Sequence, residues 1–208
     1  MPERDRVFAD TATLYPISIA DLLLRLAEID VIEFVWSDHL LDEVTRVLVE
    51  DKHLLRAAAV YFCDCIRDTF PTGRVERSAY EHLLLTRTGP DPDDHEHSAA
   101  AIAGEATVLL SADKTGFPFR DTKPVQRRHP DDYLTEILHR FPDETLHAIT
   151  EMGRSRKQPQ PAEDVLSALR RAGSDVSQHE RSNSSEFPPV IELSVVSSNE
   201  CRLEEMSG

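Results

Sequence analysis

Short apolar runs alternate with helical patterns through about the first 120 residues of the chain. Residues 6–10, 31–36 and 107–111 are largely apolar, as expected for strands that are covered on both faces. Residues 18–29 and 37–50 carry apolar side chains at the spacing of an amphipathic helix. This alternation favours an α/β fold in which a parallel sheet is sandwiched by helices.

A different pattern follows Lys123, where we expect helices alone. Two stretches each open with a Pro-Asp pair, and a third, PAEDVLSALRRAG, has Pro161 near its start and Gly173 at its end. The last stretch is rich in Ser, Asn and Glu, which is typical of a disordered tail. We therefore expect an α/β domain over residues 1–122, a C-terminal helical region over 123–177 and a mostly disordered tail over 178–208.

Composition restricts the class of protein. Hydrophobic residues make up 40% of the 208 residues, and no apolar run approaches the roughly 18–20 residues that a membrane-spanning helix needs. The charged N-terminus does not resemble a secretory signal, so we expect a cytoplasmic protein without a membrane partner. Cys63, Cys65 and Cys201 are too few to form a disulfide framework. We expect Cys63 and Cys65 to be small residues on a partly buried helix.

The formal net charge of −15 bears on any role with nucleic acid, because binding to phosphate usually needs a positive surface. One explanation is that acidic residues concentrate in a metal site and in the tail, which leaves a local basic strip. The other is that the chain does not bind nucleic acid. Net charge alone does not choose between them, because steering depends on the local field.

Four acidic residues occupy positions where active sites of α/β proteins form. Asp10 follows the first strand, Asp113 follows the strand at 107–111, and Asp94 opens the helix that leads into that strand. Glu43 lies on the second helix. Because active sites lie outside the carboxyl ends of parallel strands, we expect the four side chains to meet at one edge of the sheet.

Such a cluster has a clear chemical use. Carboxylates that are packed together repel one another unless a cation lies among them. Oxygen ligands suit Mg²⁺ or Mn²⁺ better than Zn²⁺. One or two such ions activate a water molecule for attack on a phosphodiester and stabilise the leaving oxygen, so no side-chain nucleophile is needed.

Each acidic residue also has a plain structural interpretation. Asp10 and Asp113 are common turn residues, and Asp94 is suited to capping a helix. Glu43 fits a solvated helix position. Asp91 fits either a supporting role beside a metal site or an ordinary loop carboxylate.

Three segments carry a resemblance when they are taken together: VFADTATLYPISIADLLLRLAE, VWSDHLLDEVTRVL and PDPDDHEHSAAAIAGEATVLLSADKTGFP. They resemble the PIN-domain family, in particular the branch that includes VapC-type toxins. The resemblance covers about residues 6–120 and continues more weakly to about residue 175.

The resemblance extends to individual acidic positions. Asp10 matches the aspartate after the first strand, and Glu43 matches the glutamate of a Leu-Asp-Glu helix. Asp94 matches the aspartate that opens a helix of small residues, and Asp113 matches the Asn or Asp after the next strand. Asp91 matches a further acidic position of this branch.

The resemblance implies a PIN-like nuclease domain over residues 1–122 and a metal-dependent endoribonuclease, similar to the toxin of a type II toxin–antitoxin pair. It implies that Mg²⁺ or Mn²⁺ is held by the matched acidic residues, with RNA as the substrate. It also implies a homodimer and an antitoxin protein that covers the site. The catalytic set would be Asp10, Glu43, Asp94 and Asp113, and Asp91 would join them as a metal ligand.

The chain departs from the usual motifs of this branch at three places. This chain has Asp10-Thr11-Ala12 where the branch usually has Asp-Ala-Asn, and His95-Glu96 where it often has Arg-His. It has Ser111-Ala112-Asp113 where Thr-Phe-Asn is more usual. These changes keep the acidic residues but alter their neighbours. With the net charge, they favour an alternative, a catalytically weakened PIN scaffold that acts as a binding protein. A flap-type or DNA-directed nuclease is disfavoured, because nothing resembles a helical arch or a duplex-binding motif.

The histidines and arginines are weaker candidates. His95 and His97 lie on different sides of a helix, so we expect surface or packing histidines rather than joint metal ligands. The basic run at residues 127–129 is a candidate contact for phosphate. Arg46 lies one turn after Glu43, where it either reaches phosphate or pairs with an acidic neighbour.

Overall fold

Five parallel strands form one sheet within the part of the chain that the structure, a computed structural model, describes: residues 4–51, 53–113, 115–155 and 158–179. The strand order is β3-β2-β1-β4-β5. The strands are β1 (Arg6–Ala9), β2 (Glu33–Ser37), β3 (Arg74–Val75), β4 (Val108–Leu110) and β5 (Gln126–Arg128). The predicted α/β fold with a parallel sheet is confirmed, and it is consistent with a PIN-like fold.

The order in which successive strands are added to the sheet reverses at β1. The chain runs from β1 outward through β2 to β3, and then crosses back to place β4 and β5 on the other side of β1. In the β1–β4 pair, Ala9 lies opposite Leu110. The carboxyl ends of β1 and β4 therefore meet at a topological switch point, where ligands bind in open α/β sheets.

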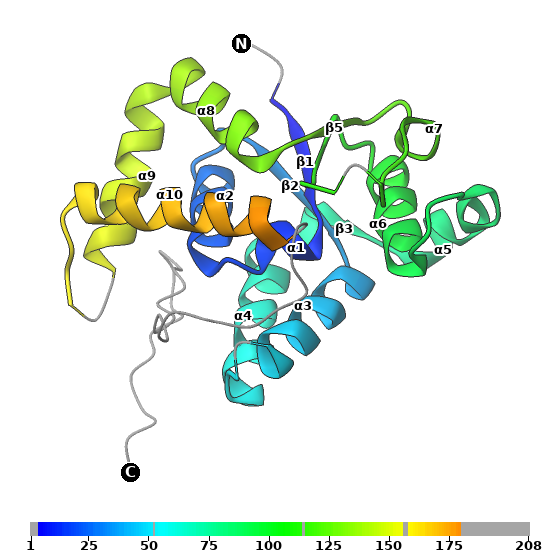
Figure 1. Cartoon of the computed structure of the whole chain (residues 1–208), viewed down its shortest axis with the longest axis horizontal. Helices are drawn as coiled ribbons and strands as arrows, with labels where there is room; N and C mark the ends of the chain where they lie inside the picture. The colour runs from blue at the N-terminus through cyan, green and yellow to red at the C-terminus, as the bar shows by residue number, and fades with distance from the viewer. Residues whose placement is uncertain (1–3, 52, 114, 156–157, 180–208) are drawn as a thin grey trace.

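Helices cover the sheet and continue beyond it (Figure 1). The longer ones are α2 (Ile17–Glu28), α3 (Asp38–Glu50), α4 (Arg56–Thr69), α6 (Pro92–Ala103), α8 (Pro130–Arg140), α9 (Pro142–Arg154) and α10 (Ala162–His179). The short ones are α1 (Thr11–Leu14), α5 (Arg77–Tyr80), α7 (Phe119–Thr122) and the 3-10 turns η1 (Pro71–Gly73) and η2 (Glu81–Thr86). Helix α3 packs against α4 and also contacts α1, β2 and α6.

Side-chain caps fix the starts of the helices nearest the carboxyl ends of the strands. Ser37 accepts a 3.3 Å hydrogen bond from the backbone N–H of Leu40 and so caps α3. The interpretation of Asp94 as the cap of α6 is wrong, because Asp91 is the cap and accepts the bond from the N–H of Asp93 at 3.0 Å. Pro92 explains the earlier start, since proline is favoured in the first turn, where its missing N–H costs nothing.

The C-terminal helices return to the N-terminal half of the chain. Helices α9 and α10 pack against each other, and both contact α2 (Figure 1). Helix α10 continues to His179, past the predicted end at Gly173. The expected division into parts at residues 122 and 177 stays a prediction, and the tail from residue 180, with Cys201, lies outside the described residues.

Strand β5 differs from the prediction of helices alone after Lys123. It pairs with β4, and Arg127 lies opposite Leu109. A three-residue edge strand made of Gln and Arg has no apolar run to reveal it, and charged side chains are common on edge strands. Pattern-based interpretation finds the buried central strands and misses this one.

The core is continuous across the sheet. Trp36 is buried, and its indole N–H donates to the carbonyl of Phe70 at 2.8 Å. Cys63 and Cys65 are buried on α4 and form no disulfide among the described residues, in agreement with a packing role. Among the described residues, no helix is long and apolar enough to cross a membrane.

Truncation of a central core residue tests this packing. Leu109 in β4 is fully buried, so Leu109→Ala should lower the free energy of unfolding by about 2 to 5 kcal/mol through lost burial and a cavity. Leu85→Ala is the matched control, because Leu85 is 91% exposed and its loss should cost less than about 0.5 kcal/mol. Urea unfolding of both variants measures the difference, and equal effects would contradict this description of the core.

Candidate metal centre

Asp10 lies at the switch point, directly after β1. Its backbone N–H donates to the carbonyl of Leu110 at 3.0 Å, which extends the pairing of β1 with β4 by one residue. Its carboxylate accepts from the N–H of Thr13 at 2.7 Å and from the Ser111 side chain. The side chain is buried, and burial raises the pKa of Asp10, although the bonds from Ser111 and Thr13 oppose the shift.

Asp94 and Asp113 share a small space beside Gly116. A Cβ atom placed on Gly116 would lie 2.0 Å from Asp94 Oδ2 and 2.6 Å from Asp113 Oδ2. The two carboxylate oxygens are therefore within a few ångströms of each other. Asp113 is held by its own turn, since Oδ1 accepts from the N–H of Thr115 at 2.6 Å. Glycine at position 116 leaves the room that both carboxylates occupy.

The electrostatics of Asp94 connect the aspartates into one site. Burial raises the pKa of Asp94 to about 7, and the negative charges of Asp91, Asp10 and Asp113 add to the increase, while His97 opposes it. Like charges shift a carboxyl pKa in this way only when they are close and poorly screened. The structure thus brings together Asp10, Asp94 and Asp113. Asp91 is an exposed helix cap whose charge still acts on Asp94.

Glu43 joins the site from α3. Its Oε2 accepts a 2.7 Å hydrogen bond from Thr11 and lies 3.0 Å from His97 Nε2. Burial raises the pKa of Glu43, but the contacts with His97, Thr11 and Arg46 outweigh it, so the net shift is downward. Burial lowers the pKa of His97, but the adjacent Glu43 and the charges of Asp10 and Asp94 outweigh it, so the net shift is upward. Both shifts favour an ion pair between Glu43 and His97.

Two histidines near Glu43 were not expected at the site. His39, Glu43 and His97 each offer one potential ligand atom, and these atoms lie within 4.8 Å of one another, a group that could hold a metal ion. The spacing of His39 and Glu43, four residues apart on one helix, places them on one face and was the available signal. His97 lies three residues after Asp94 on α6, which was the available signal for it, and the packing of α6 against α3 brings it to Glu43.

The other candidates have different positions. His95 points away from His97, as expected, and its Nε2 lies 2.7 Å from the carbonyl of Gly89. Of the basic run at 127–129, Arg127 donates to the carbonyl of Ser111 at 3.0 Å, at the edge of the site. Arg128 instead pairs with Glu136, and His129 caps α8.

The geometry therefore groups Asp10, Glu43, Asp94 and Asp113 at one edge of the sheet, and Asp91 caps the adjoining helix α6. Their assignment as metal ligands remains a prediction. A family model, the VapC50 C-terminal domain, matches residues 130–175, which correspond to α8, α9 and most of α10. No curated protein matches the chain. The match points to a VapC-type relation for the C-terminal helices, a segment that lies outside the sheet.

The raised pKa of Asp94 gives a test by protein stability without divalent ions. The pKa is about 7 in the folded chain against an ordinary value of 3.8, so the folded state binds this proton more tightly. The free energy of unfolding should then fall as the pH rises from about 4 to 7. Asp94→Asn should remove this loss and be more stable than the parent at pH 8, on the order of 1 to 2 kcal/mol after allowance for solvent screening.

Urea unfolding in the presence of a chelator, at pH 4 and at pH 8, measures this difference. The two proteins should differ little in stability at pH 4, where Asp94 is protonated in the folded state and the unfolded-state carboxyl is close to its ordinary pKa of 3.8. Asp132→Asn, at an exposed position of α8, is the matched control. If the parent protein is as stable as Asp94→Asn at pH 8, the ionised Asp94 is not destabilised by burial or by the neighbouring aspartates.

Proposed function

We propose that the protein is a metal-dependent endoribonuclease related to VapC-type toxins. The observation that carries the proposal is the convergence of Asp10, Asp94 and Asp113 at the carboxyl ends of β1 and β4. Burial and the neighbouring negative charges there raise the pKa of Asp94 to about 7. Carboxylates this crowded, at a topological switch point, are costly in the absence of a cation. The match of residues 130–175 to the VapC50 C-terminal domain supports the same relation.

The donor set fits a divalent ion that prefers oxygen. Asp10, Glu43, Asp94 and Asp113 would hold Mg²⁺ or Mn²⁺, and Asp91 would contribute from the edge of the site. When bound, the ion would supply an activated water for attack on the phosphodiester and stabilise the leaving oxygen. A divalent ion would also offset the repulsion that raises the pKa of Asp94.

The protein's own groups hold the carboxylates in position. Ser111 and the N–H of Thr13 orient Asp10, and Thr11 orients Glu43. Since each bond is made to the ionised carboxylate, it favours the charged form that a cation needs. Thr11 and Ser111 thus have a supporting role, although each belongs to a motif that departs from the family pattern.

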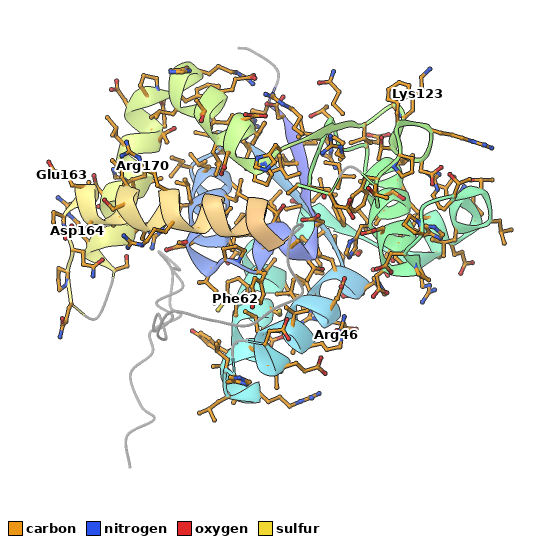
Figure 2. The ribbon with its side chains drawn as sticks, in the orientation of Figure 1. Arg46, Phe62, Lys123, Glu163, Asp164 and Arg170 are labelled. Carbon is orange, nitrogen blue, oxygen red and sulfur yellow. The ribbon has the colours of Figure 1, made fainter. Side chains whose placement is uncertain are left out.

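RNA must approach a chain with a net charge of −15, so local cations matter. Arg46 lies on α3 (Figure 2), one turn beyond Glu43, and its side chain is 51% exposed. Its guanidinium lies 3.5 Å from Glu43 and 4.0 Å from Asp93. Arg127 lies at the edge of the site through Ser111. These two arginines are the proposed contacts for the RNA backbone.

The same relation leads us to propose the biological setting. The protein would act in the cytoplasm as the toxin of a toxin–antitoxin pair, as a homodimer inhibited by a small antitoxin protein. Residues 1–122 would form the nuclease domain, and residues 123–177 the helical region that supports partner or substrate binding.

Cleavage of a single-stranded RNA by the purified, partner-free protein tests the activity. Rates should depend on Mn²⁺ or Mg²⁺ and should fall about 100-fold or more in Asp10→Asn and Asp113→Asn, because each change removes a ligand charge. Asp132→Asn should cleave at the parent rate. If the parent shows no metal-dependent cleavage although it is folded, the alternative of a scaffold that only binds partners is favoured.

A further inference from the structure

His97 is a buried ionisable group beside the carboxylates, and the proposed mechanism does not use it. The residue is 2% exposed, and its ring lies 5.9 Å from that of Phe8. Among the described residues, Nδ1 has no hydrogen-bond partner, and Nε2 lies 3.0 Å from Glu43 Oε2 without the angle of a hydrogen bond. A buried polar atom without a partner is costly, so an unmet ligand contact is a reasonable cause.

A second histidine faces the same carboxylate. The rings of His39 and His97 are 5.8 Å apart in an edge-to-face arrangement. His39 lies four residues before Glu43 on α3, and its Nε2, which is buried, lies 3.2 Å from Asp93 Oδ1, again without the geometry of a hydrogen bond. Two imidazoles and one carboxylate thus converge from α3 and α6.

We propose that His39, Glu43 and His97 form a binding site for Zn²⁺ beside the aspartates, with Glu43 shared between the two sets. Their potential ligand atoms lie within 4.8 Å of one another, so small side-chain rotations bring them to the Zn–N and Zn–O distances of about 2.0 to 2.2 Å. Three protein ligands leave the fourth position of a tetrahedral ion to water.

The ligand types separate this site from that of the proposed nuclease. Imidazole nitrogen suits Zn²⁺ and other late transition metals, whereas Mg²⁺ takes oxygen ligands. The site goes beyond the proposed function and does not require it. Where the nuclease proposal holds as well, Zn²⁺ would take Glu43 away from Mg²⁺ or Mn²⁺ and so inhibit cleavage.

A simple ion pair is the competing interpretation. A protonated His97 beside an ionised Glu43 satisfies the charge of both groups, in line with their pKa shifts. It does not give a role to His39, whose buried Nε2 has no hydrogen-bond partner among the described residues. Metal binding that depends on His39 therefore distinguishes the two interpretations.

Titration of the metal-free, full-length protein with Co²⁺ is the direct experiment. Co²⁺ in a tetrahedral site of two histidines and one carboxylate absorbs visible light, and Zn²⁺ should displace it and abolish the absorption. Competition with a chromophoric chelator then gives the Zn²⁺ affinity. His39→Gln should weaken it at least about tenfold, as should His97→Gln if that variant folds.

Two controls complete the experiment. His147→Gln, at an exposed position on α9, should leave the affinity unchanged. Asp113→Asn should retain the Co²⁺ absorption, because Asp113 is outside the three-ligand set. The proposal is overturned if Co²⁺ gives no tetrahedral spectrum, or if His39→Gln binds Zn²⁺ as the parent does. The titration contains no RNA, so it tests the Zn²⁺ site independently of nuclease activity. If the protein shows the Co²⁺ spectrum but does not cleave RNA in the separate assay, only the proposed function is overturned.

Discussion

The parallel pairing of β1 with β4 is the constraint on which the site depends. Because Ala9 lies opposite Leu110, the chain leaves both strands at the same level. Asp10 and Ser111 are then adjacent without any further adjustment, and the turn after β4 carries Asp113 to the same edge. The backbone bond from Asp10 to Leu110 continues the β1–β4 pairing into the site, so the sheet itself places the backbone of Asp10.

Opposite pKa shifts within one small site show how neighbours decide the state of each group. Asp94 faces other aspartates and holds its proton up to a pKa of about 7, whereas Glu43 faces His97 and Thr11 and is ionised more readily. His97 therefore balances the charge of Glu43 near α3, but it offsets only part of the effect of burial and of the neighbouring aspartates on Asp94. This asymmetry is what would draw an external cation to the aspartates.

The sequence was sufficient for the central strands, the main helices and the edge of the sheet at which acidic residues meet. Asp10 and Asp113 could be placed because a polar residue after a buried parallel strand has one available location. The edge strand β5 was missed because it has no apolar residues, and the cap at Asp91 because several aspartates compete locally. The pairing of His97 with Glu43 needed the contact of α6 with α3, a long-range packing fact that no local spacing contains.

Gly116 links the shape of the site to the loop after β4. Two carboxylates occupy the volume where any other residue would carry its Cβ atom. A side chain at position 116 would therefore displace one or both carboxylates, whereas the side chain of the adjacent Thr115 is exposed. Among distant relatives, we therefore expect glycine at this position in chains that keep both acidic residues, and another residue there in chains that have lost one of them.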